Sequence, residues 1–208
     1  MSGKIIVTVS RQAGCGGLEI GQRLARQLSA IYVDKKTIAK ASEGLDAVLK
    51  VNDDTKVGNR FWELLGKTPI LYDMESYIPE MRSIVSDSQV HEKEEEILLK
   101  LAGQGPAVVV GRGGFHRFRD YPKVIHLFLS GDQEYRIENY KRIFCLEESD
   151  AKALLLATDQ ATERYVRKVT GNDMLDTRNY DLVINVSKLD FNCVIELVLD
   201  YIHYRFER

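Results

Sequence analysis

The fold of this chain is decided by the stretch Ile5-Ile-Val-Thr-Val-Ser-Arg-Gln-Ala-Gly-Cys-Gly-Gly-Leu-Glu-Ile20. An apolar, β-branched run leads into three closely spaced glycines and then into a segment with helical periodicity. The layout is that of the phosphate-binding loop G-x-x-x-x-G-K-[ST]. When the second glycine of that pattern falls on Gly16, Arg11 takes the place of the first glycine and Gly17 that of the lysine. The stretch therefore predicts a strand, an anion-binding turn and a helix, without the usual lysine.

The turn has the features of an anion site even without that lysine. Glycines permit positive φ angles, so that backbone N–H groups converge, and a helix beginning near Gly17 adds the positive end of its dipole. Arg11 is the nearest replacement for the lost charge, and Glu19 or a water is the nearest candidate to approach Mg²⁺. The alternative is a glycine-rich turn that only packs tightly, with Arg11 paired to a carboxylate. The candidate phosphate-binding residues are Ser10, Arg11, Gln12, Ala13, Gly14, Cys15, Gly16, Gly17, Leu18 and Glu19.

Short apolar runs alternate with helical patterns along the rest of the chain. This alternation predicts an α/β fold of three layers, with a five-stranded parallel sheet and helices on both faces. Residues 1–208 are expected to form one domain, with a helical insertion at 35–103 that covers the acceptor and a lid at 146–170. A capping box of Ser130 and Gln133 is expected to open the helix after the fourth strand. The predicted strands are Ile5–Val9, Ile31–Val33, Val108–Val110, Val124–Leu129 and Leu182–Val186.

Three further sites carry charged side chains where a ligand cleft is expected. Asp34 and Lys35 follow the second strand and point toward the cleft, unless Asp34 caps the next helix. Arg112 lies between glycines after the third strand, which suits a phosphate ligand, although a surface arginine in a turn gives the same pattern. Arg164 and Arg167 share a helical face and are candidate lid arginines, although Glu163 is spaced for a surface ion pair with Arg167.

Composition sets limits on the class of protein. A net charge of −2 argues against a dedicated binder of polymeric nucleic acid, and no apolar run is long enough to predict a membrane helix. Three widely separated cysteines predict reduced thiols and a cytoplasmic protein, and the four histidines lack metal-ligand spacing. The run His91-Glu-Lys-Glu-Glu-Glu96 is interpreted as a solvated helix face. No zinc site is predicted, and no direct protein ligand is assigned to Mg²⁺.

Taken together, these segments resemble the cytidylate kinase-like proteins, a branch of the P-loop nucleoside monophosphate kinases. The resemblance covers nearly the whole chain. It rests on Ser10-Arg-Gln-Ala-Gly-Cys-Gly-Gly17, Tyr32-Val-Asp-Lys35, Gly111-Arg-Gly113, Pro122-Lys-Val-Ile-His-Leu-Phe-Leu129, Asp132–Arg136, Asp159–Arg167 and Asn179-Tyr-Asp-Leu-Val-Ile-Asn185.

The resemblance implies a role for each motif. Gly14, Gly16 and Gly17 would cradle the phosphates of ATP, and Asp34, Lys35 and Arg112 would face the acceptor, with Arg112 on its phosphate. Arg164 and Arg167 would be lid arginines that bridge donor and acceptor. Together with Arg11, the replacement for the loop lysine, they are the expected catalytic residues.

The expected activity is ATP-dependent phosphoryl transfer, with Mg²⁺, to a nucleotide or another small acceptor. The alternatives are a regulatory protein that binds a nucleotide or phosphometabolite without catalysis, and a kinase of the same fold with another acceptor. No membrane partner is expected. The aromatic segment 201–206 is expected to pack on the core, and association with a second copy is left open.

Overall fold

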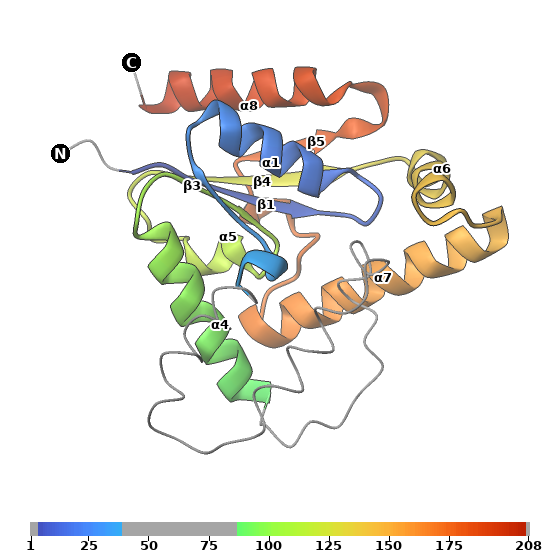
Figure 1. Cartoon of the computed structure of the whole chain (residues 1–208), viewed down its shortest axis with the longest axis horizontal. Coiled ribbons are helices and arrows are strands. Elements are labelled where there is room, and N and C mark those ends of the chain that lie inside the picture. Colours follow the sequence, from blue (N-terminus) through green and yellow to red (C-terminus); the bar gives the residue numbers. More distant parts are fainter. Residues whose placement is uncertain (1–3, 39–86, 207–208) are drawn as a thin grey trace.

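A computed structural model describes residues 4–38 and 87–206 of the chain. Its centre is a five-stranded parallel sheet in the order β2-β3-β1-β4-β5 (Figure 1). The elements are β1 (Ile6–Arg11), α1 (Gly17–Gln27), β2 (Ile31–Val33), α4 (Asp87–Ala102), β3 (Ala107–Val110), α5 (Gly114–Arg117), β4 (Val124–Ser130), α6 (Gln133–Phe144), α7 (Glu148–Thr170), β5 (Leu182–Asn185) and α8 (Phe191–Phe206), with short 3₁₀ turns at Thr177–Asn179 and Val186–Lys188.

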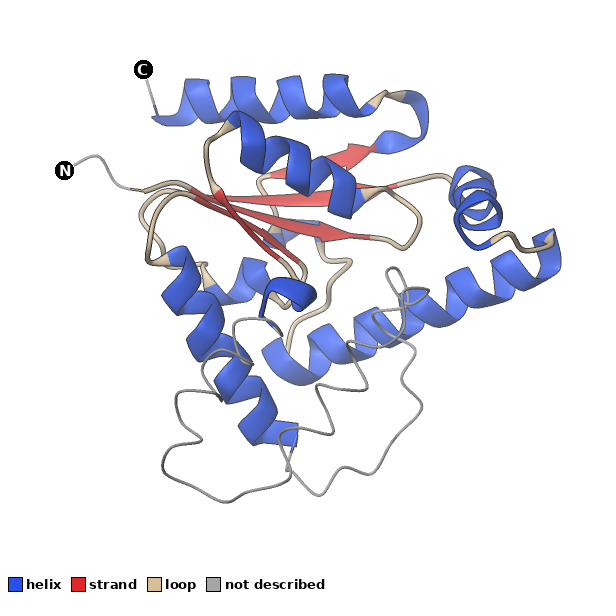
Figure 2. Cartoon of the chain, in the orientation of Figure 1, coloured by secondary structure: helices blue, strands red, loops and turns tan. Residues whose placement is uncertain are grey.

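Helices cover both faces of the sheet because its strands are apolar on both sides. Val7 and Val9 of β1 belong to a core shared with α1 and α8, whereas Ile6 belongs to a second core shared with α4. Successive side chains of a strand point to opposite faces, so one strand contributes side chains to both cores. Figure 2 shows α1 and α8 on one side of the sheet and α4 and α5 on the other. The three-layer α/β fold predicted from the sequence is confirmed.

The central position of β1 places its carboxyl end between two other strand ends. Val9 lies opposite Val110 of β3 and Leu127 of β4, and Arg11 lies opposite Leu129. The loops that follow β1 and β3 therefore leave the sheet at the same edge. In open α/β sheets this edge is where ligands bind.

The predicted strands match the observed ones to within two residues at either end. Of the predicted insertion at 35–103, the structure describes a helical turn through Ile38 and then α4, and residues 39–86 of that prediction lie outside the described residues. The capping-box prediction was wrong. Ser130 is the last residue of β4 and donates to the carbonyl of Ile184, and the residue before α6 is Asp132.

Candidate active site

The glycine-rich loop between β1 and α1 has the backbone expected of an anion site. Gly14 and Gly16 have φ angles of 78° and 69°, in the left-handed region that favours glycine. Gly16 precedes the first residue of α1, and no side chain in the described part of the chain caps this helix. The first N–H groups of an α-helix have no intrahelical acceptor. At α1 they are therefore available to an external anion.

The Arg11 side chain lies across this loop and does not extend away from the protein. A Cβ atom built on Gly17 would lie 2.8 Å from Arg11 Cγ, and one built on Gly111 would lie 2.7 Å from Arg11 Nη1. The aliphatic part of Arg11 thus passes over Gly17, and its guanidinium reaches the loop after β3. Glycine at position 17, where the usual motif has lysine, leaves the space through which this arginine runs.

A buried ion pair holds the loop from the side of α6 and α7. Arg136 Nη1 donates to Asp159 Oδ2 at 2.5 Å, and Asp159 Oδ1 accepts from the N–H of Ala13 at 2.8 Å. Arg136 also donates to the carbonyls of Ala13 and Gly131, and Asn139 Nδ2 donates to the carbonyl of Gly14. The loop conformation is therefore fixed by side chains from two later helices. Arg136 and Asp159 lie within motifs on which the family resemblance rests, but no role was predicted for either of them.

The loop after β3 is unusual because three successive residues have positive φ. The angles are 74° at Gly111, 56° at Arg112 and 63° at Gly113. A non-glycine residue in this region is uncommon, and such positions gather at functional sites. The conformation directs Arg112 toward a carboxylate on α4 and a ring on α7.

These two partners of Arg112 are Glu94 and Tyr165. Arg112 Nη1 lies 3.1 Å from Glu94 Oε1 and 3.3 Å from Oε2, and its guanidinium carbon lies 4.6 Å from the ring centroid of Tyr165. The Tyr165 hydroxyl donates to Glu94 at 3.3 Å. Burial raises the pKa of Tyr165, against the opposing effect of the Arg112 charge. Three elements thus converge on one charged cluster, which we call the Glu94–Arg112 pair.

The burial of Glu94 was not predicted, because the acidic run around it was interpreted as a solvated helix face. Its neighbours Glu95 and Glu96 are exposed, but Glu94 itself is buried. A usable signal was present: Ile97 and Leu98 follow it at three and four residues, which puts all three on one helical face. Ile97 and Leu98 are both in the core.

After the second strand, the two charged residues take different positions. Asp34 is buried, and its Oδ1 accepts from the N–H and the hydroxyl of Thr37, both at 2.8 Å. This is the helix-capping alternative considered for Asp34. Lys35 lines the cavity described below. A role for Asp34 at the acceptor stays a prediction.

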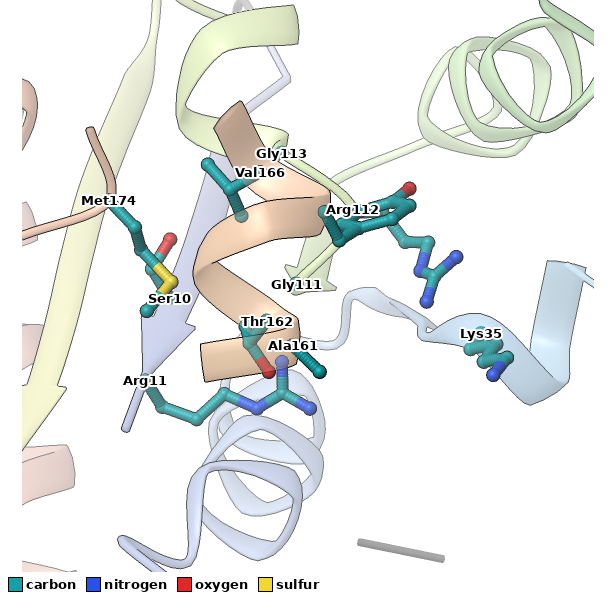
Figure 3. A pocket seen from close by; sticks show the side chains of 11 residues that line it. Ser10, Arg11, Lys35, Gly111, Arg112, Gly113, Ala161, Thr162, Val166 and Met174 are labelled. Atoms are coloured by element: carbon teal, nitrogen blue, oxygen red, sulfur yellow. The ribbon is translucent and has the colours of Figure 1, made fainter. Parts of the chain in front are cut away.

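A cavity of about 200 Å³ lies between the end of β1, the β3 loop and α7, and of the predicted phosphate-binding residues only Ser10 and Arg11 line it. Figure 3 shows Arg11 extending from the end of β1, Arg112 beside α7, and Lys35 on the other side of the cavity. Three cationic side chains therefore surround one small space. Its lining is Ser10, Arg11, Lys35, Gly111, Arg112, Gly113, Ala161, Thr162, Tyr165, Val166 and Met174.

Arg164 and Arg167 are not part of this lining. Both side chains are exposed, and Arg167 is ion-paired with Asp173 at 3.2 Å. Successive residues of a helix are about 100° apart, so the face that brings Thr162 and Tyr165 to the cavity turns the two arginines aside. In this conformation α7 presents only uncharged side chains to the site. The catalytic role of the two arginines stays a prediction.

Glu19, the residue expected near Mg²⁺, is exposed on α1 and ion-paired with Arg23. Within the described ranges, no group of three or more His, Cys, Asp or Glu side chains is arranged to hold a metal ion. In those ranges there is likewise no helix long and apolar enough to cross a membrane.

Comparisons with known proteins agree with this architecture. No curated protein sequence matches the chain. An uncharacterized protein from Eubacterium ventriosum ATCC 27560 has 18% identity and a TM-score of 0.72, and the alignment covers 97% of this chain and 100% of the other. Shikimate kinase from Bacteroides thetaiotaomicron has 14% identity and a TM-score of 0.54, covering 98% and 99%. A gluconokinase from Sinorhizobium meliloti 1021 has 15% identity and a TM-score of 0.50, covering 99% and 94%.

These structures share the fold of the chain, and the first of them shares it most fully. The model of the cytidylate kinase-like family matches residues 6–188, which include the glycine-rich loop, the β3 loop, α7 and β5. The five-stranded parallel sheet is that of the kinases just named. The chain belongs to the cytidylate kinase-like family.

Proposed function

We propose that the protein is an ATP-dependent phosphotransferase that acts on a small acceptor. The observation that carries this proposal is the convergence of Arg11, Lys35 and Arg112 on one cavity, where the Arg11 side chain also passes over Gly17, the first residue of α1. Phosphoryl transfer needs little covalent chemistry from a protein, since catalysis comes from positioning and charge neutralisation. Cationic side chains beside a helix N-terminus supply both.

The residues present fit the phosphates of ATP. Gly14 and Gly16 have the left-handed backbone of a cradle, and the first N–H groups of α1 are available as donors. Bound there, ATP would supply the phosphoryl group, with Mg²⁺ held mainly through its phosphate oxygens.

Different residues of the protein would have different roles in the transfer. The Arg11 guanidinium, which runs between Gly17 and Gly111, would replace the lysine of the usual loop and neutralise charge on the phosphoryl oxygens. The Arg136–Asp159 pair keeps the loop backbone in place, so the cradle need not be ordered at the moment of binding. Lys35 and Arg112 lie across the cavity, where the acceptor would enter. Closure of α7 as a lid would exclude water.

A second candidate is a regulatory protein that binds a nucleotide or phosphometabolite without catalysis. The specific observation in its favour is that α7 offers only Ala161, Thr162, Tyr165 and Val166 to the cavity. Arginines delivered by a lid stabilise the charge of the transition state in many phosphotransferases. A binding protein does not need them.

The two candidates differ in turnover. The purified full-length protein is incubated with γ-labelled ATP, Mg²⁺ and panels of nucleoside monophosphates and non-phosphorylated metabolites, while ATP affinity is measured by calorimetry with and without Mg²⁺. A phosphotransferase labels at least one acceptor and binds ATP more tightly with Mg²⁺. ATP binding without transfer to any acceptor would favour the regulator.

Arg11→Ala tests the residue placed at the phosphates. We expect it to lose most of the transfer rate, because the remaining groups do not neutralise the same charge. Arg26→Ala removes an equal charge from the exposed last turn of α1 and is the matched control. Equal activity of the two variants would contradict the role given to Arg11.

A further inference from the structure

The Glu94–Arg112 pair determines which chemical group an acceptor can bring to Arg112. Arg112 was predicted from the sequence to hold the phosphate of an acceptor nucleotide. The structure instead gives it a carboxylate 3.1 Å away, with side chains only 10% and 11% exposed. A phosphate placed on this guanidinium would also lie next to the carboxylate of Glu94. Like charges brought together in a partly buried site repel strongly, because solvent screens them less than at the surface.

The same pair is well suited to a hydroxyl group. A hydroxyl both donates and accepts hydrogen bonds, whereas a phosphate dianion only accepts them. Glu94 offers acceptor oxygens beside the N–H donors of Arg112, so one hydroxyl can satisfy both. The Tyr165 ring, 4.6 Å from the guanidinium, keeps Arg112 against α7 and preserves this arrangement.

The size of the cavity agrees with a small acceptor. Its volume of about 200 Å³ lies below the roughly 300–1,000 Å³ typical of sites for drug-sized ligands. Arg11 also lines it, so the negative charge of the transferred phosphoryl group can be neutralised at the end of β1.

We propose that the acceptor is a small hydroxyl compound that carries no phosphate, and that Glu94 is the residue that excludes phosphorylated acceptors. This inference rests on the proposed phosphotransferase function. In the transfer step the acceptor oxygen bonds the γ-phosphorus of ATP, the bond from that phosphorus to the bridging oxygen breaks to give ADP, and the hydroxyl proton is released to water.

Glu94→Gln tests the exclusion without knowledge of the acceptor. The variant keeps the shape of the side chain and removes its charge, so Arg112 is left to attract an anion. Calorimetry with inorganic phosphate and with a nucleoside monophosphate should give an affinity for each about tenfold higher than that of the wild type. Glu95→Gln makes the same change one residue away, on a side chain that pairs with Arg117 outside the cavity lining, and should leave both affinities unchanged.

The double variant Glu94→Gln/Arg112→Gln shows whether the gained phosphate affinity depends on Arg112. If phosphate binds at Arg112, the double variant loses the gained affinity. A gain that survives in the double variant, or no gain in Glu94→Gln, would overturn the inference. Thermal unfolding of each variant confirms that the comparison is made between folded proteins.

Label transfer by the wild type provides a measurement that does not depend on any variant. Non-phosphorylated polyols, sugars and hydroxy acids should accept label from γ-labelled ATP, and nucleoside monophosphates should accept at least tenfold less. Preferred transfer to monophosphates would overturn the inference, whereas transfer to neither class while ATP binds would favour the regulator and overturn the proposed function. Absence of ATP binding to the wild type would also overturn the proposed function, and the phosphate affinities would still decide the role of Glu94.

Discussion

Two buried arginine–carboxylate pairs, one beside the glycine-rich loop and one beside the cavity, do different things. Arg136 and Asp159 use their remaining donors and acceptors on backbone groups, at Ala13 of the loop and at Gly131 between β4 and α6. Arg112 and Glu94 are buried to a similar degree, but Arg112 lines the cavity and stacks on Tyr165. Burial therefore does not separate a structural arginine from one in a binding site. The difference lies in what else each guanidinium can reach.

The largest expected effect comes from breaking the pair beneath the loop. Asp159→Ala leaves the Arg136 charge buried without its carboxylate and removes the acceptor of the Ala13 N–H, so we expect the free energy of unfolding to fall by about 3–5 kcal/mol. Urea unfolding of the wild type and of the variant measures this difference in free energy.

The matched control for that variant is Asp120→Ala. Asp120 pairs with Arg119 at the surface, and its loss should cost less than about 1 kcal/mol. Similar costs for the two variants would remove the structural distinction drawn for the Arg136–Asp159 pair.

Breaking the pair at the cavity should cost less stability. Glu94→Gln leaves Arg112 beside the Tyr165 ring and next to the cavity, so we expect a loss of about 1–3 kcal/mol. Added phosphate should then raise the melting temperature of this variant more than that of the wild type, because the anion binds only the folded state. A loss equal to that of Asp159→Ala, with no response to phosphate, would make the two pairs equivalent.

A substitution at Gly17 can displace the Arg11 side chain without removing it. Gly17→Ala places a Cβ atom 2.8 Å from Arg11 Cγ, too close for the arginine to keep its path, while the helix tolerates alanine at this position. We expect phosphoryl transfer to fall about tenfold, with the free energy of unfolding changed by less than about 1 kcal/mol. Gly105→Ala, whose Cβ would meet only Ile31 at 3.9 Å, is the control for a glycine outside the site. A Gly17→Ala enzyme as active as Gly105→Ala would show that the path of Arg11 is unimportant.

The smallest effect is expected at Tyr165. Tyr165→Phe keeps the ring over Arg112 and removes a long hydrogen bond to Glu94, which should cost about 0.5 kcal/mol near neutral pH. Burial raises the pKa of Tyr165 in the folded state above that of the unfolded chain, so its contribution to stability is present below about pH 10 and is lost as the pH rises through the raised value. The difference in unfolding free energy between wild type and variant, measured from pH 8 upward, should therefore move in favour of the variant. A difference that does not change with pH would contradict this account.

Much of the fold could be predicted because it depends on local patterns. Apolar β-branched runs such as Val108–Val110 have to be covered on both faces, and the glycines at 14, 16 and 17 mark the turn into a helix. The loop before α1, the position of Lys35 and the placement of Arg112 at a strand end all followed from the rule that ligands meet the carboxyl ends of parallel strands.

The partners of those residues could not be predicted in the same way. Glu94 is 18 residues from Arg112 and sits in an acidic run, and Asp159 is 146 residues from Ala13. Nothing local separates a buried glutamate from its exposed neighbours except the apolar residues that follow it at helical spacing. The rotation of α7 that turns Arg164 and Arg167 away from the cavity is set by its packing on the rest of the molecule.

The sequence by itself determined the α/β layering, the glycine-rich loop and the absence of its lysine, because periodicity and glycine content act over a few residues. Only the tertiary structure decided that Arg11 runs through the space left by Gly17. It also decided that Arg136 supports the glycine-rich loop and that Arg112 is ion-paired with Glu94. Each of those outcomes depends on which side chains long-range packing brings within a few ångströms of a guanidinium. That distance decides whether its charge is available to a ligand.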